Sequence, residues 1–149
     1  MPTVEMAART DAGLASELRL SVMRLRRRLS NERHPDNPHS MGAMAVLGCL
    51  LRNGDLTVGE LAAHERIQPP SMTRIVNALE EGGYVARRAH ETDGRQVVVV
   101  LSEPGRATVL ADRARRDAWL ARRLSGLTPD ERDTLRRAAP ILERLATTD

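Results

Sequence analysis

The stretch from Gln68 to Leu101 constrains the fold most, because it marks where two neighbouring elements begin and end. It opens QPPSMTRIVNALEEGGYV, with two prolines at one end and two glycines near the other. Proline costs little in the first turn of a helix, and glycine adopts the left-handed conformation that often follows one. We therefore predict a short helix over residues 69–81, with Gly82 and Gly83 as its exit.

A β-hairpin is predicted directly after this helix, in the segment ARRAHETDGRQVVVVL. Two short strands, 84–89 and 96–102, flank the pair Asp93-Gly94, which favours a tight turn. Arg95 follows this turn, where its guanidinium could enter a narrow minor groove while Asp93 holds it by a charge-assisted hydrogen bond. Alone, Asp-Gly-Arg is a common turn, and only its context gives it meaning.

That context is a second short helix just before the first. Thr57 and Glu60 have the spacing of a capping box, which predicts the helix VGELAAHERI and a tight turn at Ile67-Gln68. Two helices joined by such a turn make a helix-turn-helix, and a following hairpin adds a wing. The predicted fold class is therefore mainly α with a small antiparallel β-hairpin, a winged helix-turn-helix.

The 69–81 helix has one apolar and one polar side, because its residues advance by about 100° each. Met72, Ile75, Val76 and Leu79 lie on the apolar side. Hydroxyl, guanidinium and carboxamide groups on the polar side are the groups that recognise base edges. An ordinary amphipathic helix is the alternative, and the helix-turn-helix context favours DNA. The candidate major-groove residues are Gln68, Pro70, Ser71, Thr73, Arg74 and Asn77.

The N-terminal third is predicted to hold two helices. Apolar residues recur every three or four positions from Leu14 to Leu29, after a loose leader over residues 1–12. Residues 31–39 are rich in Pro and Asn, which indicates a loop. Ser40 then has the position of an N-cap for MGAMAVLGCLLRNG, whose nearly continuous apolar character predicts a buried helix.

The C-terminal third is predicted to be helical as well. One helix should run from about Ser102 or Glu103 to Leu124. Thr128 and Glu131 form a second capping box, with Pro129 in the first helical position, and start a last helix.

Composition limits how such a chain builds its core and binds its partners. Aromatic residues make up 1%, with no Phe, one Trp and one Tyr, so an aliphatic core is expected and a partner chain could complete it. All 23 basic residues are Arg, and the formal net charge is +3. Residues 56–102 nevertheless hold five Arg and six Asp or Glu. DNA binding by this middle segment must therefore depend on a few placed arginines rather than on a diffuse basic field.

Several classes of function lack the residues they need. The sequence has no glycine-rich phosphate loop, nucleophile elbow or His-Glu-x-x-His helix, which argues against an enzyme and a cofactor. Its four histidines are scattered, so we expect no metal site, although a zinc-responsive regulator stays open as a weaker alternative. A single cysteine, no signal-peptide pattern and no membrane-spanning apolar run predict a cytoplasmic protein.

The chain resembles the MarR family of winged-helix transcriptional regulators over about Leu14 to Leu145. The resemblance rests on PPSMTRIVNALEEGGYV and on ARRAHETDGRQVVVVLSEPGR, most specifically on Asp-Gly-Arg followed by LSEPGR. It implies a homodimer in one domain over 1–149, with dimerisation helices at about 12–33 and 103–146 and a DNA-binding lobe at about 40–102. It also implies a repressor on a pseudo-palindromic operator, released in many members by a small, often aromatic, anion.

The same resemblance assigns roles to particular side chains. The polar-side residues of the 69–81 helix would face the major groove, and Arg95, supported by Asp93, would enter the minor groove. Cys49 differs from the reactive cysteine of oxidation-sensing members, because it lies in an apolar helix. Candidate phosphate contacts are Ser40, Thr57, Arg87 and Arg88; for Ser40 helix capping alone is favoured, and at most one of the two arginines should face DNA, because they alternate along a strand.

Three functions remain to be distinguished. The first is a dimeric, sequence-specific regulator that binds double-stranded DNA. The second is a winged-helix module for protein–protein contact without DNA binding, which the near-neutral middle segment favours. The third is a sensor whose main event is the capture of a small molecule, and this is compatible with the first.

Overall fold

The computed structural model describes residues 10–148, and the chain divides into two compact units. One unit comprises Arg33–Ala114, and the other combines residues 10–32 with residues 115–148. The expected leader over residues 1–9 lies outside the described residues. Helix α2 (Asp11–Asn31) begins at Asp11, so residues 11 and 12 belong to a helix and not to the predicted leader.

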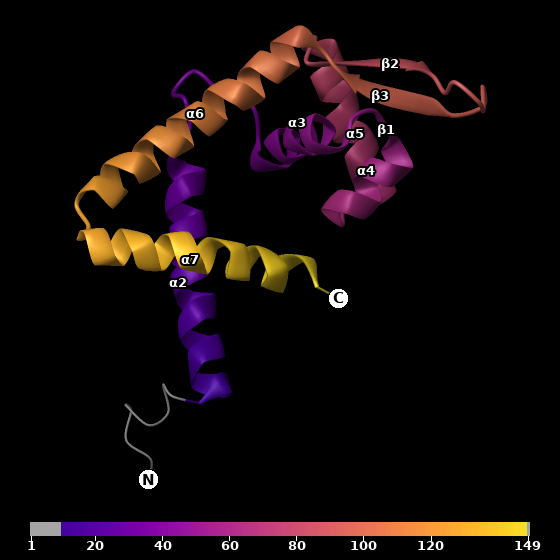
Figure 1. The fold of residues 1–149 in the computed structure, drawn as a ribbon. Coiled ribbons are helices and arrows are strands. Elements are labelled where there is room, and N and C mark those ends of the chain that lie inside the picture. The colour runs from indigo at the N-terminus through magenta and orange to yellow at the C-terminus, as the bar shows by residue number, and fades with distance from the viewer. Residues whose placement is uncertain (1–9, 149) are drawn as a thin grey trace. The chain divides into compact units, whose positions relative to one another are not determined.

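Three helices, the first half of a fourth and a three-stranded sheet build the unit Arg33–Ala114. The hairpin of β2 (Val85–Ala89) and β3 (Val97–Leu101) extends away from helices α3 (Met41–Asn53), α4 (Val58–Glu65) and α5 (Pro69–Glu81) (Figure 1). The sheet is antiparallel in the order β1-β3-β2. Strand β1 (Leu56–Thr57) was not predicted, because its second residue, Thr57, is also the N-cap of α4. The first half of α6 (Glu103–Ser125) completes the unit.

The caps predicted from sequence set the ends of these helices. Ser40 Oγ accepts a hydrogen bond from the amide of Ala43 at 3.1 Å and starts α3. Thr57 and Glu60 form the reciprocal capping box of α4. At the end of α5 only Gly83 is left-handed, with φ +80°, whereas Gly82 keeps a helical φ of −77°; the predicted glycine exit therefore uses one of the two residues.

The core of this unit is aliphatic, as the composition predicted. Val46 and Leu47 of α3, Leu61 of α4 and Val99 of β3 are fully buried. The apolar side of α5 packs against them: Met72 and Val76 are fully buried, Leu79 is nearly so and Ile75 is half-buried. This packing fixes which side of α5 remains exposed.

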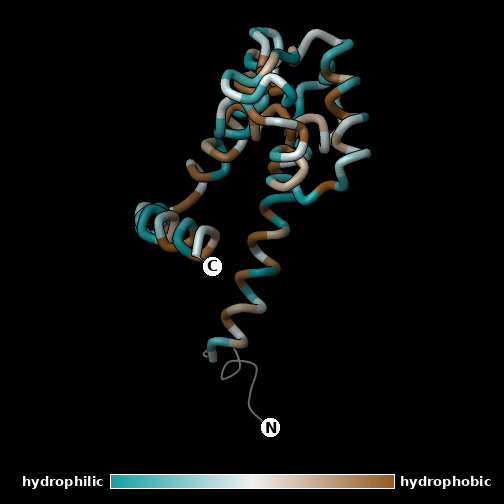
Figure 2. The backbone as a smooth tube through the Cα atoms, turned by 90° about the vertical axis from the view of Figure 1, so that its right-hand side faces the viewer, coloured by the Kyte–Doolittle hydropathy of each residue, from teal (hydrophilic) through white to brown (hydrophobic). Residues whose placement is uncertain are grey.

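The other unit consists of α2 (Asp11–Asn31), the second half of α6 and α7 (Pro129–Thr147). Hydrophobic and hydrophilic residues alternate along α2 and α7 (Figure 2), yet neither helix contains a buried residue. Trp119 of α6 is the exception in this unit, since it is buried between the guanidinium groups of Arg28 and Arg123 at 5.4 and 5.2 Å from its ring centroid. Trp119 therefore packs against two arginines of the same chain.

Between residues 10 and 148, no helix is long and apolar enough to cross a membrane.

Candidate nucleic-acid interface

The exposed side of α5 carries the polar residues that the sequence indicated. Pro70, Thr73, Arg74 and Asn77 are exposed, and Ser71 is half-buried. Gln68 is the N-cap of α5, yet its side chain makes no capping hydrogen bond, so its carboxamide stays available. Five of the six candidate major-groove residues are therefore exposed, and Ser71 is partly so.

Thr73 and Arg74 differ in whether an intramolecular hydrogen bond engages their side chains. The Thr73 hydroxyl donates to the carbonyl of Pro69 at 3.0 Å, which leaves its lone pairs directed outward as acceptors. Arg74 makes no hydrogen bond or ion pair with any other described side chain, so its five N–H donors are free for an outside partner.

Arg87 of β2 reaches back to α5 and joins two of its side chains. Its Nη2 donates to Asn77 Oδ1 at 2.7 Å, and its Nη1 donates to Glu80 Oε1 at 2.7 Å. We call this three-residue arrangement the Arg87 bridge. The sequence indicated Arg87 only as a candidate phosphate contact, because nothing in the pattern shows that the hairpin folds back toward the helix.

Arg88 is also engaged, on the other side of the strand. It is hydrogen-bonded to Asp55, and a Glu91 oxygen lies 3.9 Å from its Nη1. The hydrogen bond with Asp55 raises the pKa of Arg88 above its usual value. Neither of the two neighbouring arginines is therefore an isolated cation, although both have exposed surface.

The formal charges of the unit Arg33–Ala114 nearly cancel. Residues 33–114 hold nine Arg and ten Asp or Glu. Besides Arg87 and Arg88, Arg52 lies 3.9 Å from Glu65. The arginines that keep an unpaired guanidinium near α5 and the wing are thus few, in agreement with the charge count from sequence.

The hairpin tip is shaped by Asp93, although not in the way we predicted. Asp93 Oδ1 accepts from the backbone amide of Arg95 at 3.1 Å and makes no ion pair with the Arg95 guanidinium. His90 Nδ1 accepts from the amide of Asp93 at 3.1 Å and closes the other side of the turn. The predicted side-chain bond is therefore replaced by a backbone one, because a carboxylate two residues before an amide readily forms an Asx-turn. The Arg95 side chain remains exposed.

The two N-cap hydroxyls lie where the sequence indicated. Thr57 and Ser40 both accept bonds from amides of the helix that each starts, which is the capping role. Arg66, which the sequence did not single out, is the left-handed C-cap of α4 with φ 53° and lies exposed in the turn before α5. A positive φ is uncommon for a residue other than glycine, and no pattern in the sequence announces it.

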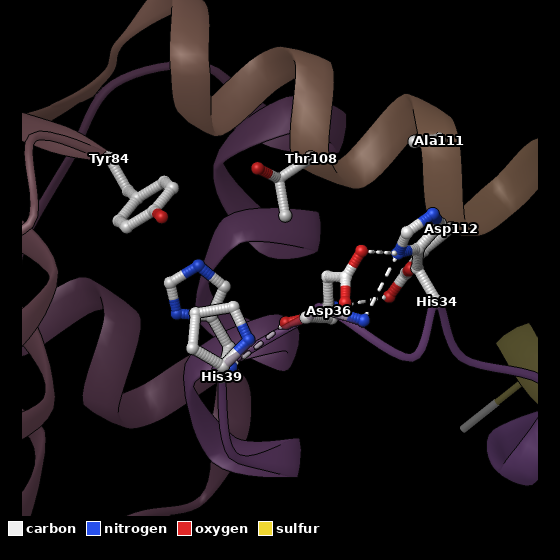
Figure 3. Close-up of a pocket in the computed structure, with 9 residues that line it drawn as sticks. His34, Asp36, His39, Tyr84, Thr108, Ala111 and Asp112 are labelled. Carbon is white, nitrogen blue, oxygen red and sulfur yellow. Dashed lines mark hydrogen bonds and ion pairs between the residues drawn. The ribbon is translucent and has the colours of Figure 1, made fainter.

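The same unit contains a cavity of about 200 Å³. The rings of His39 and Tyr84 meet edge to face, with centroids 4.1 Å apart (Figure 3). Asn37 donates to the carboxylate of Asp112 at 2.9 Å, and Asp112 is 2% exposed. The lining residues are His34, Asp36, Asn37, Pro38, His39, Tyr84, Thr108, Ala111 and Asp112.

His39 has a lowered pKa, chiefly because it is partly buried and secondly because Arg33 lies nearby. Its Nε2 is buried without a hydrogen-bond partner in the described structure, which suits a neutral imidazole. Sequence reasoning missed this cavity, because its walls come from three segments far apart along the chain. Only the isolated tyrosine in an aromatic-poor sequence could have drawn attention to it.

Cys49 and the histidines offer no reactive or metal site in the part of the chain that the structure describes. Cys49 is 1% exposed, and burial raises its pKa, so the thiol stays protonated. Among residues 10–148, no group of three His, Cys, Asp or Glu side chains could hold a metal ion.

Sequences similar to this chain belong to transcriptional regulators. Residues 40–97 match the model of the MarR family. An HTH-type transcriptional regulator of Mycobacterium tuberculosis is 47% identical over 89% of this chain and 92% of its own length. The HTH-type transcriptional repressor MdtR of Bacillus subtilis is 29% identical over 89% of this chain and 86% of its own.

Solved structures agree with the sequence comparison. A putative transcriptional regulator of Pseudomonas aeruginosa superposes with a TM-score of 0.82 at 37% identity, over 93% of this chain and 97% of its own. A MarR family protein of Bacillus stearothermophilus gives 0.80 at 28% identity, over 94% and 97%. FabT of Streptococcus pneumoniae, solved in complex with DNA, shares the fold with a TM-score of 0.68 at 20% identity, over 91% and 97%.

Proposed function

The chain belongs to the MarR family of HTH-type transcriptional regulators, and from this premise we propose that it represses transcription as a homodimer on a pseudo-palindromic operator. The observation that carries the proposal is the exposed polar side of α5, where an unpaired Arg74 lies beside Thr73 and Asn77 on a helix held rigid by its buried opposite side. We place this side in the major groove. The Arg95 side chain at the hairpin tip then enters the neighbouring minor groove.

The terminal helices support the dimer. Several apolar residues of α2 and α7 are about half exposed, among them Leu14, Val22, Ile141 and Leu145. A monomer rarely leaves such an amphipathic face open to water, and burying one large aliphatic side chain is worth about 1.5–3 kcal/mol. We propose that a second copy covers these faces, so that residues 12–33 and 103–146 are the dimerisation regions and residues 40–102 the DNA-binding lobe.

We further propose that a small molecule releases the dimer from DNA by entering the cavity lined by His39, Tyr84 and Asp112. Tyr84 directly follows Gly83 at the end of α5, so a ligand that displaces its ring acts on the position of that helix. At about 200 Å³ the cavity is smaller than the ~300–1,000 Å³ of most ligand pockets, which restricts the effector to a compact molecule. The repressor name of the related MdtR supports the direction of regulation. A regulator of transcription acts where the chromosome is, so we propose the cytoplasm as its location.

Selection of bound duplexes from a random DNA library tests the proposal. We expect enrichment of a two-fold symmetric sequence whose half-sites are centred about one helical turn apart, roughly 10 bp. Enrichment of an asymmetric sequence contradicts the dimer arrangement.

A winged-helix module for protein–protein contact is the second candidate, and the near-neutral charge of residues 33–114 favours it. The two candidates differ in how DNA affinity responds to salt. Phosphate contacts release counterions, so a regulator loses affinity with increasing salt, whereas a protein-binding module enriches no duplex at any salt concentration.

A further inference from the structure

The Arg87 bridge leads to an inference about base specificity that rests on the proposed function. We propose that Arg87 fixes Asn77 as a hydrogen-bond donor toward the major groove, so that Asn77 selects a base carrying a keto oxygen, guanine or thymine. Arg87 is in this account a positioning residue for specificity and makes no phosphate contact.

The geometry of the bridge is well defined at both ends. Asn77 and Glu80 lie three residues apart on α5, which makes them neighbours on one helical face. Arg87 is anchored from the sheet, since its backbone pairs with Val99, a fully buried residue of the central strand. Both of its terminal nitrogens are 2.7 Å from oxygens of the helix. The bridge therefore connects the recognition helix to the base of the wing.

Chemistry decides the orientation of the amide. A guanidinium group has donors and no acceptor, so the Asn77 atom that faces Arg87 must be the oxygen. The amino group of Asn77 then points away from Arg87. Free asparagine recognises adenine by using both groups at once, with the oxygen on N6–H and the amino group on N7. The oxygen keeps a second lone pair, but because one is engaged by Arg87 the two-point contact with adenine is less favourable.

Asn77 therefore offers mainly its amino donor, and the base edges in the major groove differ in which of them can accept from a donor. Guanine presents O6 and N7, thymine presents O4, and cytosine presents only the N4 amino donor. An outward amino group therefore favours guanine or thymine and disfavours cytosine. Adenine offers N7 as an acceptor, but its N6 amino donor lies beside N7 and faces the Asn77 amino donor, so adenine is less favoured than guanine or thymine.

A phosphate contact by Arg87 predicts different behaviour. Arg87 forms an ion pair with Glu80 through Nη1, and its Nη2 donates a hydrogen bond to Asn77. Loss of a phosphate contact weakens binding to all sequences about equally and lowers the salt slope by about one, without altering any base preference. The two roles can therefore be separated by sequence preference alone.

The test is library selection with the full-length chain and three variants, each checked for cooperative thermal unfolding. Arg87→Ala frees the Asn77 oxygen, so one symmetric pair of positions should change from guanine or thymine to adenine, by about 5- to 150-fold in relative affinity. Arg87→Lys keeps a pure donor opposite the oxygen and should retain the wild-type preference. Asn77→Asp turns the outward group into an acceptor and should select cytosine or adenine at the same positions.

The outcomes separate this inference from the function on which it rests. If the wild-type chain enriches no DNA sequence, both the proposed function and the inference are wrong. A wild-type chain with a clear operator, combined with an Arg87→Ala variant that binds all sequences more weakly at unchanged preference, overturns the inference alone. If Arg87→Ala does not fold, Asn77→Asp decides, and an unchanged preference in that variant overturns it as well.

Discussion

Gly105 of α6 lies against Tyr84, which follows α5, and its replacement by alanine should be strongly destabilising. A Cβ atom at this position would lie 2.1 Å from the carbonyl oxygen of Tyr84 and 2.8 Å from Leu101 Cδ1. The Tyr84 carbonyl cannot simply move away, because it accepts from the amide of Ser102 at 3.2 Å. The obstacle is backbone rather than the end of a flexible side chain, so relief requires α6 or the start of β2 to shift.

Forcing extra atoms into a packed site costs about 1–3 kcal/mol, and the depth of this overlap places Gly105→Ala at about 3 kcal/mol. In a chain of this size each kcal/mol lowers the melting temperature by about 2–4 °C, so we expect a decrease of roughly 6–12 °C. Thermal unfolding followed by circular dichroism measures it.

Gly59→Ala is the matched control. Gly59 is exposed in α4, and the nearest atom to an added Cβ is Thr57 Oγ1 at 3.8 Å. This variant should be neutral or stabilised by up to about 1 kcal/mol, because alanine favours the helix. If Gly105→Ala melts at the same temperature as Gly59→Ala, the close packing of α6 on Tyr84 is wrong.

Three further predictions concern the site. Arg74→Ala should cost about 1–3 kcal/mol of DNA binding and relax selectivity at one base position, as measured by fluorescence anisotropy on a set of single-base operator variants; an equal loss on every variant would make Arg74 a phosphate contact instead. Arg95→Ala should lower affinity chiefly at operators with A·T-rich flanks, and an unchanged binding curve excludes the wing from DNA contact. The pKa of His39 is lowered on folding, so below the unfolded pKa of about 6.5 the unfolded chain binds more protons than the folded chain, and the free energy of unfolding decreases as the pH falls. Between about pH 7.5 and pH 5.5 the His39→Gln variant should therefore lose less stability than the wild type. Equal losses in the two proteins contradict this.

The elements of the fold were predictable where local chemistry determines them. Proline at N1, the two capping boxes and the left-handed Gly83 act over three or four residues, and α4, α5 and α7 begin where these signals predict. The short strand β1 was missed, because its pairing with β3 depends on residues more than 40 positions away. Contacts at that distance leave no local pattern in a single sequence.

The sequence predicted which residues of the candidate site are exposed, but not which of them form hydrogen bonds with one another. Periodicity alone separated the buried side of α5 from its exposed side, as the burial of Met72 and Val76 shows. It could not show that Arg87 folds back onto Asn77, or that Asp93 bonds to the backbone of Arg95 instead of its side chain. Such contacts depend on the curvature of the hairpin and on the rotamers of long side chains, which emerge only when the sheet and helix are packed together.

A spacing experiment on the selected operator tests the central claim most directly. Two α5 helices related by a two-fold axis can enter adjacent major grooves only if the half-sites lie on the same face of the duplex. Insertion of five base pairs between the half-sites rotates one of them by about half a turn, given a repeat of about 10–10.5 bp. We predict that the dimer loses its specific affinity for this duplex and retains only the affinity of a single half-site. Unchanged affinity would contradict the account.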